Sequence, residues 1–155
     1  MIQSDSIQYS GMSAQLKEHR ETEKEETYWI DNAFGGMPTY QLGAKYPYDI
    51  LTPIHKIFRL IPHPAFLLFL YFFSFYFLMV NLKIPIELSV LGALAYGFST
   101  YLLIIIQVGH NTKAQALGYM PLVISGMLLI FNGKYRLGFI ISLLSMALNI
   151  RANHY

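Results

Sequence analysis

Four long apolar segments, joined by short polar turns, make up most of the chain beyond residue 65. They cover residues 66–82, 86–108, 114–131 and 137–150, and Glu87 is the only charged residue within them. A helix needs about 20 apolar residues, within a range of about 17–25, to cross a bilayer. The first three segments meet that length, and a tilt or a continuation of the chain would complete the fourth. The sequence therefore predicts four transmembrane segments.

The fold class predicted from these segments is an all-α polytopic membrane protein. In lipid the backbone has to satisfy its own hydrogen bonds, so segments that cross the bilayer form helices. The alternative, a soluble protein with these segments in its core, would have almost no polar surface. Small residues at Gly92, Ala93 and Gly97 predict close packing of the second segment against a neighbouring helix.

Charged residues divide the chain into two regions. Eight of the nine carboxylates precede residue 50, and Glu87 alone follows it. We therefore separate a polar region, residues 1–63, from a transmembrane helical region, residues 64–155. The net charge is only +2 and no basic run is present, so the sequence does not favour nucleic acid as a partner. The chain has no cysteine, which excludes disulfides and thiolate metal sites.

Lysine and arginine in the short turns predict how the segments cross the membrane. Lys83 lies between the first two segments, and Lys134 and Arg136 lie between the last two. Cytoplasmic turns are enriched in these residues, so both turns are expected on the cytoplasmic side. Residues 1–63, the turn after residue 108 and the end of the fourth segment are then extracytoplasmic. Lys113 and Arg151 would then lie on the extracytoplasmic side, where this rule predicts few basic residues.

This topology also predicts that the chain is a fragment of a larger membrane protein. Its first residues form neither a signal peptide nor a hydrophobic anchor, although the topology places them outside. The fourth segment is followed only by a few polar residues. An earlier membrane segment is therefore expected before this sequence, unless the region crosses by another route.

The polar region predicts helices joined by a turn-rich loop. Residues 13–26 carry mixed charges at helical spacing, which is typical of a solvated surface helix. Residues 50–60 place apolar side chains on one face and cations on another, which predicts an interfacial helix along the membrane. Glycines and prolines between them predict ordered turns. The loop also contains aromatic side chains suited to the headgroup layer, namely Tyr28, Trp29, Phe34, Tyr40, Tyr46 and Tyr48.

Unusual polar side chains gather on the predicted outer side. Aspartate with histidine can perform general acid–base chemistry or bind a divalent cation. Lysine and arginine can hold a phosphate or pyrophosphate, and at a bilayer such an anion would belong to a lipid carrier. The candidate residues are Asp5 and Gln8 near the start of the chain, His110, Asn111 and Lys113 after the second segment, and Arg151, Asn153 and His154 after the fourth.

Five of these residues also have a structural explanation. Asp5 can be the N-cap of the first helix. His110 and His154 can be ordinary polar residues of short turns, and Lys113 and Arg151 can extend to lipid headgroups without a ligand. The residues alone therefore predict a polar cluster at a membrane surface and specify no reaction.

The chain resembles the YfhO-type bacterial membrane proteins, especially those of the Bacteroidota. The resemblance rests on four motifs in order: QSDSIQY, YWIDNAFGGMPTYQ, YGFSTYLLIIIQVGHNTKAQALGYMPLV and MALNIRANHY. That family is similar to the polytopic GT-C glycosyltransferases, which pass a sugar from a polyprenyl-phosphate carrier to an acceptor on the extracytoplasmic side. The resemblance implies an enzyme of the bacterial inner membrane, with a polyprenyl-phosphate-linked sugar and an envelope glycan or lipid acceptor as partners.

The resemblance also implies a role for Asp5. GT-C enzymes have an acidic residue in the first outer loop, and Asp5 occupies that place, with Gln8 close by. Asp5 would be the catalytic residue that deprotonates the acceptor hydroxyl or helps to bind a divalent metal. Many members have two adjacent acids, whereas Ser6 follows Asp5 here, which leaves metal dependence open. The remaining candidates have polar or charged side chains and are predicted on the same extracytoplasmic side of the membrane. We therefore expect them to line the same cavity.

Two other classes of function compete with the transferase. A transporter or lipid flippase also needs polar residues near helix ends, but it predicts charges deep within the spans, and residues 66–82 and 114–131 carry none. A non-catalytic assembly protein of the envelope would leave Asp5 and His110 replaceable. Binding of a nucleotide sugar is not favoured, because no dinucleotide or P-loop pattern is present.

Overall fold

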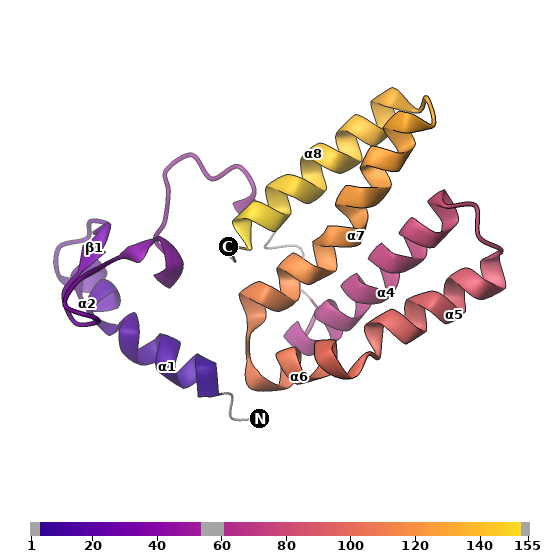
Figure 1. The fold of residues 1–155 in the computed structure, drawn as a ribbon. Helices are drawn as coiled ribbons and strands as arrows, with labels where there is room; N and C mark the ends of the chain where they lie inside the picture. Colours follow the sequence, from indigo (N-terminus) through magenta and orange to yellow (C-terminus); the bar gives the residue numbers. More distant parts are fainter. Residues whose placement is uncertain (1–3, 54–60, 153–155) are drawn as a thin grey trace. The chain divides into compact units, whose positions relative to one another are not determined.

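The computed structural model describes residues 4–53 and 61–152. The chain divides into two compact units, Met1–Ile50 and Leu51–Tyr155, here called unit 1 and unit 2. Unit 2 is mainly helical, unit 1 combines short helices with turns and loops, and the one sheet among the described residues is a two-stranded sheet in unit 1 (Figure 1). The predicted all-α class is therefore confirmed.

Unit 1 is a small helical unit with a hairpin packed on it. Its elements are α1 (Ser4–Met12), α2 (Ala14–Thr22), the strands β1 (Trp29–Ile30) and β2 (Met37–Pro38), and a 3-10 helix, η1 (Thr39–Leu42). Leu16, Ile30 and Leu42 are fully buried together and form its core. The side chain of Gln15 accepts hydrogen bonds from the backbone N–H groups of Asp31 and Asn32, at 2.8 and 2.9 Å, and so holds the hairpin on α2.

The charged helix predicted at residues 13–26 is shorter in the structure, where α2 ends at Thr22. Lys24 has a positive φ of 58°, so the helix cannot continue through it. The chain then returns to α2, because Arg20 Nε donates to the Glu26 carboxylate at 2.7 Å and Arg20 Nη2 donates to the same carboxylate. Glu26 also accepts the backbone N–H of Lys45 at 2.9 Å, and Arg20 Nη2 donates to the Gly43 carbonyl at 2.8 Å.

This pair predicts how unit 1 responds to acid. The hydrogen bonds from Arg20 lower the pKa of Glu26, although partial burial acts in the opposite direction. An unfolded glutamate has a pKa of about 4.3. The stabilisation is therefore complete above that pH and is lost as the pH falls through the lower, folded pKa. We expect Glu26→Gln to reduce this acid sensitivity and to cost about 1 kcal/mol at neutral pH.

Unfolding can be followed by the fluorescence of Trp29, the single tryptophan of the chain. Glu25→Gln is the matched control, because Glu25 is the exposed neighbour of Glu26. It should change the free energy of unfolding by less than about 0.5 kcal/mol. Equal acid sensitivity in wild type and Glu26→Gln would contradict the role given to the pair.

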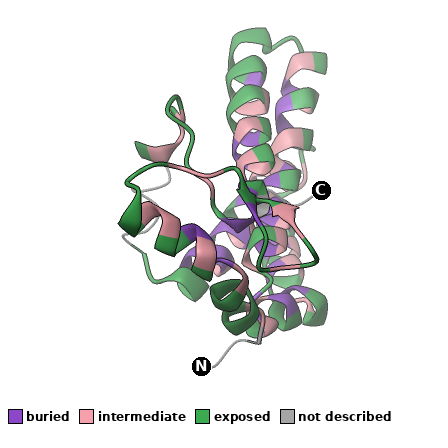
Figure 2. Ribbon diagram, turned by 90° about the vertical axis from the view of Figure 1, so that its left-hand side faces the viewer, coloured by how far each residue is buried: buried purple, intermediate pink, exposed green. Residues whose placement is uncertain are grey.

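Unit 2 is a bundle of apolar helices. They are α4 (His63–Asn81), α5 (Ile86–Gly97), α6 (Thr100–Val108), α7 (Asn111–Phe131) and α8 (Tyr135–Arg151). α7 packs against α8 and α4, and α4 packs against α5 (Figure 1). The buried core joins residues from four of these helices: Phe66, Leu67, Leu70, Tyr71, Leu102, Ile105, Ala114, Tyr119 and Leu148. Exposed residues cover the outward sides of the helices (Figure 2), and many of them are large and apolar, for example Leu91, Phe131 and Phe139.

Among the described residues, α4 and α7 are each long and apolar enough to cross a membrane, and α5 with α6 makes a third candidate if the pair is one span. The segment predicted at 86–108 is not one straight helix, because α5 and α6 meet at a bend of 42°. The break lies at Ser99, whose ψ of 139° is extended. α8 has 17 residues and is about 25 Å long at 1.5 Å per residue, shorter than a hydrocarbon core of about 30 Å.

The turns after α4 and α7 have the same local structure. After α4, the backbone N–H groups of Lys83 and Ile84 donate to the carbonyls of Val80 and Met79; after α7, those of Gly133 and Lys134 donate to Ile130 and Leu129. Both are Schellman ends with a residue of positive φ, Lys83 at 62° and Gly133 at 78°. α4 and α7 run side by side in the same direction, so both turns lie toward one end of unit 2 (Figure 1).

Candidate functional site

The predicted polar residues of unit 2 lie at the opposite end, where α7 begins and α8 ends. Gly109 adopts a φ of 97° and reverses the chain after α6, so that α7 begins directly at Asn111. His110 is the exposed N-cap residue. Lys113 extends from the first turn of α7 over the ring of Tyr101, with its Nζ 5.4 Å from the ring centroid. This cation–π contact holds the ammonium near α6.

Asn111 has a buried side-chain oxygen. Its Oδ1 has no hydrogen-bond partner among the described residues. A buried carbonyl without a donor is costly, by about 1–3 kcal/mol, and such atoms call for an explanation such as a ligand or an ordered water. Asn111 is therefore the member of the predicted group whose surroundings point most directly to a missing donor.

The end of α8 is tied to α7 by polar contacts. Asn149 Nδ2 donates to the carbonyl of Ala116 at 2.9 Å. Arg151 Nη2 donates to Thr52 Oγ1 at 3.3 Å, and its guanidinium lies near the side chain of Tyr119 of α7. The contact of Asn149 with Ala116 therefore holds the end of α8, which carries Arg151, beside the first half of α7.

Tyr119 is a residue that the sequence interpretation missed. Its side chain is only 2% exposed, and its hydroxyl has no partner among the described residues. A buried tyrosine normally finds a partner for its hydroxyl. The sequence signal for Tyr119 was a tyrosine inside the uncharged segment 114–131. Its neighbour Arg151 is distant along the chain, and only the fold brings the two residues together.

Asp5 and Gln8 belong to unit 1. Asp5 lies within the first turn of α1, where the positive end of the helix dipole favours a carboxylate, and it is partly exposed. The N-cap interpretation of Asp5 is wrong, because α1 already includes Ser4. Gln8 is exposed on the same helix. Asn153 and His154 lie outside the described residues.

A divalent metal at Asp5 stays a prediction. The part of the chain that the structure describes contains no group of three or more histidine, aspartate or glutamate side chains placed to share one ion. Asp5 would therefore need ligands beyond such a group, for example the substrate phosphate or water.

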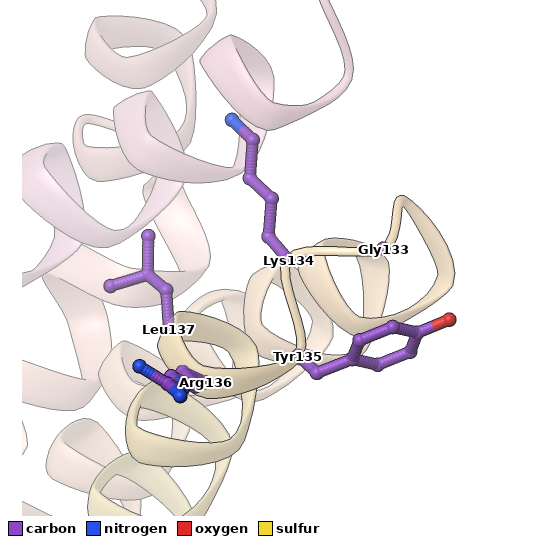
Figure 3. A pocket seen from close by; sticks show the side chains of 5 residues that line it. All are labelled: Gly133, Lys134, Tyr135, Arg136 and Leu137. Atoms are coloured by element: carbon purple, nitrogen blue, oxygen red, sulfur yellow. The ribbon is translucent and has the colours of Figure 1, made fainter.

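The other end of unit 2 has a different chemistry. Figure 3 shows the turn between α7 and α8, where Lys134, Tyr135, Arg136 and Leu137 surround a shallow open hollow together with Gly133. The aromatic ring of Tyr135 points away from the other three side chains. This end carries the cations Lys134 and Arg136 and none of the predicted site residues.

None of the family models, curated proteins or solved structures compared with the chain matches it.

Proposed function

We propose that the protein is a YfhO-type membrane glycosyltransferase with a GT-C-like helical fold. It transfers a sugar from a polyprenyl-phosphate carrier to an envelope glycan or lipid acceptor on the extracytoplasmic face of the bacterial inner membrane. In this proposal α4, the bent pair α5 and α6, α7 and α8 are four spans, with α8 tilted or extended. Unit 1 lies on the outer side.

One observation carries the proposal: at the end of the apolar bundle where α7 begins, cationic side chains occur together with buried polar atoms that have no partner among the described residues. Lys113 and Arg151 lie at the end where α7 begins, with Asn111, whose Oδ1 has no partner among the described residues, and the buried hydroxyl of Tyr119 belongs to a residue about two turns further along α7. The opposite end carries Lys83, Lys134 and Arg136, the residues that predict a cytoplasmic face. A lipid phosphate needs this combination of cation, donor and membrane boundary.

The proposed chemistry is inversion at the anomeric carbon. Asp5 takes the proton of the acceptor hydroxyl while the hydroxyl oxygen forms a bond to the anomeric carbon. The bond from that carbon to the carrier phosphate oxygen breaks, and the electron pair stays on the phosphate. Lys113 and Arg151 neutralise the charge that develops there. In this proposal His110, Asn111 and Gln8 bind the sugar and acceptor hydroxyls. Asn153 and His154 belong to the edge of the same substrate cavity.

A transporter or lipid flippase is the second candidate, and the break between α5 and α6 favours it. Discontinuous helices line the substrate sites of many transporters, and the bend of 42° at Ser99 has this form. The two candidates differ in product, because only the transferase makes a new glycosidic bond.

The test uses the gene that encodes this chain, deleted in its own host. Mass spectrometry of envelope glycans and lipid-linked sugars should show one glycan lost and its polyprenyl-linked donor accumulated, and the wild-type gene should restore both. A flippase deletion also accumulates a lipid-linked donor, so the sidedness of that donor is measured with a membrane-impermeant oxidant. Accumulation on the outer face supports transfer; accumulation on the inner face supports the flippase and contradicts the proposal.

A further inference from the structure

The hairpin of unit 1 ends in an exposed aromatic residue at an unfavourable backbone position. The backbone N–H of Gly36 donates to the carbonyl of Ala33 at 2.9 Å, and the two residues between them, Phe34 and Gly35, have φ values of 54° and 72°. A turn with positive φ at both central positions is a type I′ turn, whose first central residue is usually asparagine, aspartate or glycine. Phe34 occupies that position and is 82% exposed.

The strain at Phe34 is not offset by packing within unit 1, because the side chain points into solvent. Strained backbone positions cluster at active sites, ligand-binding segments and switch regions. The tip is also free of charge: residues 32–44 contain no charged side chain, whereas α2 carries charges along most of its length. Unit 1 thus combines an uncharged aromatic tip with a strongly charged helix. A structure with one apolar part and one charged part is suited to binding at a membrane surface.

Trp29 extends the aromatic surface at the base of the turn. Its ring packs on Gly36, where an added Cβ would lie 2.8 Å from Trp29 Cζ2. Its Nε1 donates to Asp31 Oδ1 at 3.0 Å, yet the side chain stays 55% exposed. An exposed tryptophan with a satisfied N–H is suited to the interface between headgroups and acyl chains.

We propose that this hairpin, with Phe34 at its tip and Trp29 at its base, is an anchor that inserts into the headgroup region of a lipid bilayer. The bilayer is the occupant favoured here because unit 1 is covalently joined to α4, a helix long and apolar enough to cross one. Insertion places the charged α2 in water and the uncharged tip in the interface. The proposal involves no sugar chemistry and so does not depend on the proposed function.

The test uses the full chain in phosphatidylcholine vesicles with and without bromine on the acyl chains, because bromine quenches tryptophan at short range. Trp29 is the only tryptophan, so its emission reports on the hairpin alone. We expect quenching of the wild type by brominated lipid, and at least a twofold loss of that quenching in Phe34→Asn. The same variant should raise the midpoint of unfolding, because Asn-Gly is preferred in a type I′ turn.

Two variants make the result specific to the tip. Phe34→Leu keeps an apolar side chain and should retain most of the quenching. Lys24→Asn relieves another positive φ, of 58°, at an exposed residue of unit 1, and should leave the quenching unchanged. Wild-type emission that is equal in the two kinds of vesicle would overturn the proposal, as would quenching in Phe34→Asn that equals the wild type. Protection of Trp29 by a soluble glycan instead of lipid would assign the tip to the acceptor and also overturn it.

Discussion

Replacing Gly126 or Gly138 by leucine should separate α7 from α8 and abolish the folded bundle. At these glycines the two backbones touch: a Cβ on Gly126 would lie 2.6 Å from the backbone nitrogen of Ser142, and one on Gly138 would lie 2.7 Å from the carbonyl oxygen of Gly126. Backbone atoms cannot rotate away as side chains do, so the helices have to move apart. Overpacking costs about 1–3 kcal/mol even where side chains can adjust, and we expect the upper part of that range for Gly126→Ala and a larger loss for leucine.

The measurement is the midpoint of thermal unfolding in detergent, together with the fraction of protein recovered in a monodisperse state. Gly92→Ala is the matched control, because a Cβ on Gly92 would meet the terminal methyl of the flexible Met79 side chain at 3.1 Å. It should change stability by less than about 1 kcal/mol. If Gly126→Ala is as stable as Gly92→Ala, the close contact between α7 and α8 is wrong.

Asp5→Asn should abolish sugar transfer and leave the protein in the membrane at its normal abundance. The amide has nearly the shape of the carboxylate but cannot take a proton from the acceptor hydroxyl, and loss of a general base typically lowers the rate by about 10²–10⁴-fold. In the host, the variant should match the gene deletion, with one glycan missing and its lipid-linked donor accumulated. Mass spectrometry of both pools gives the readout.

The control for Asp5→Asn is Glu21→Gln, an exposed carboxylate on α2 of the same unit. It should match the wild type. If Asp5→Asn also matches the wild type while the deletion has a phenotype, Asp5 only stabilises the first turn of α1 through the helix dipole. The transporter and the assembly protein would then be the leading functions.

Hydropathy alone predicted the positions of three helices closely. The segment 66–82 corresponds to α4, His63–Asn81, the segment 114–131 to α7, Asn111–Phe131, and the segment 137–150 to α8, Tyr135–Arg151. Apolar length is a local property, so it can be read without knowledge of the fold. The break between α5 and α6 was missed because neither Phe98 nor Ser99 is a helix-breaking residue by type. Phe98 packs edge-on against Phe72 of α4, with ring centroids 5.0 Å apart, and this contact depends on the packing of two helices.

Some of the close helix contacts at glycines were predicted from the sequence, and others were not. The small residues of the second segment predicted close packing, and a Cβ on Gly97 would indeed overlap the ring of Phe72. Gly118, Gly126 and Gly138 were not singled out, although Gly118 packs against Leu70 and the other two join α7 to α8. Their importance depends on which helix lies opposite.

The residues of the candidate site were predicted from their type and their side of the membrane. These two properties give the end of the bundle at which a residue lies, but not its burial or its contacts. The gathering of Lys113 and Arg151 at one end of unit 2 follows from the antiparallel pair α7 and α8, which the alternation of spans predicted. The buried states of Asn111 Oδ1 and the Tyr119 hydroxyl could not be predicted, because burial is set by helix rotation. Whether Asp5 reaches the same site stays a prediction.

The most direct test of the account is the sidedness of the two ends of α7. The chain has no cysteine, so single cysteines at the exposed positions Thr112 and Tyr135 can be labelled without background by a membrane-impermeant maleimide in right-side-out and inverted vesicles. We expect Thr112→Cys to react from the extracytoplasmic side and Tyr135→Cys only from the cytoplasmic side. Labelling of both from one side would show that α7 does not cross the membrane. The reverse pattern would place Lys113 and Arg151 on the cytoplasmic face and contradict the proposed extracytoplasmic transfer.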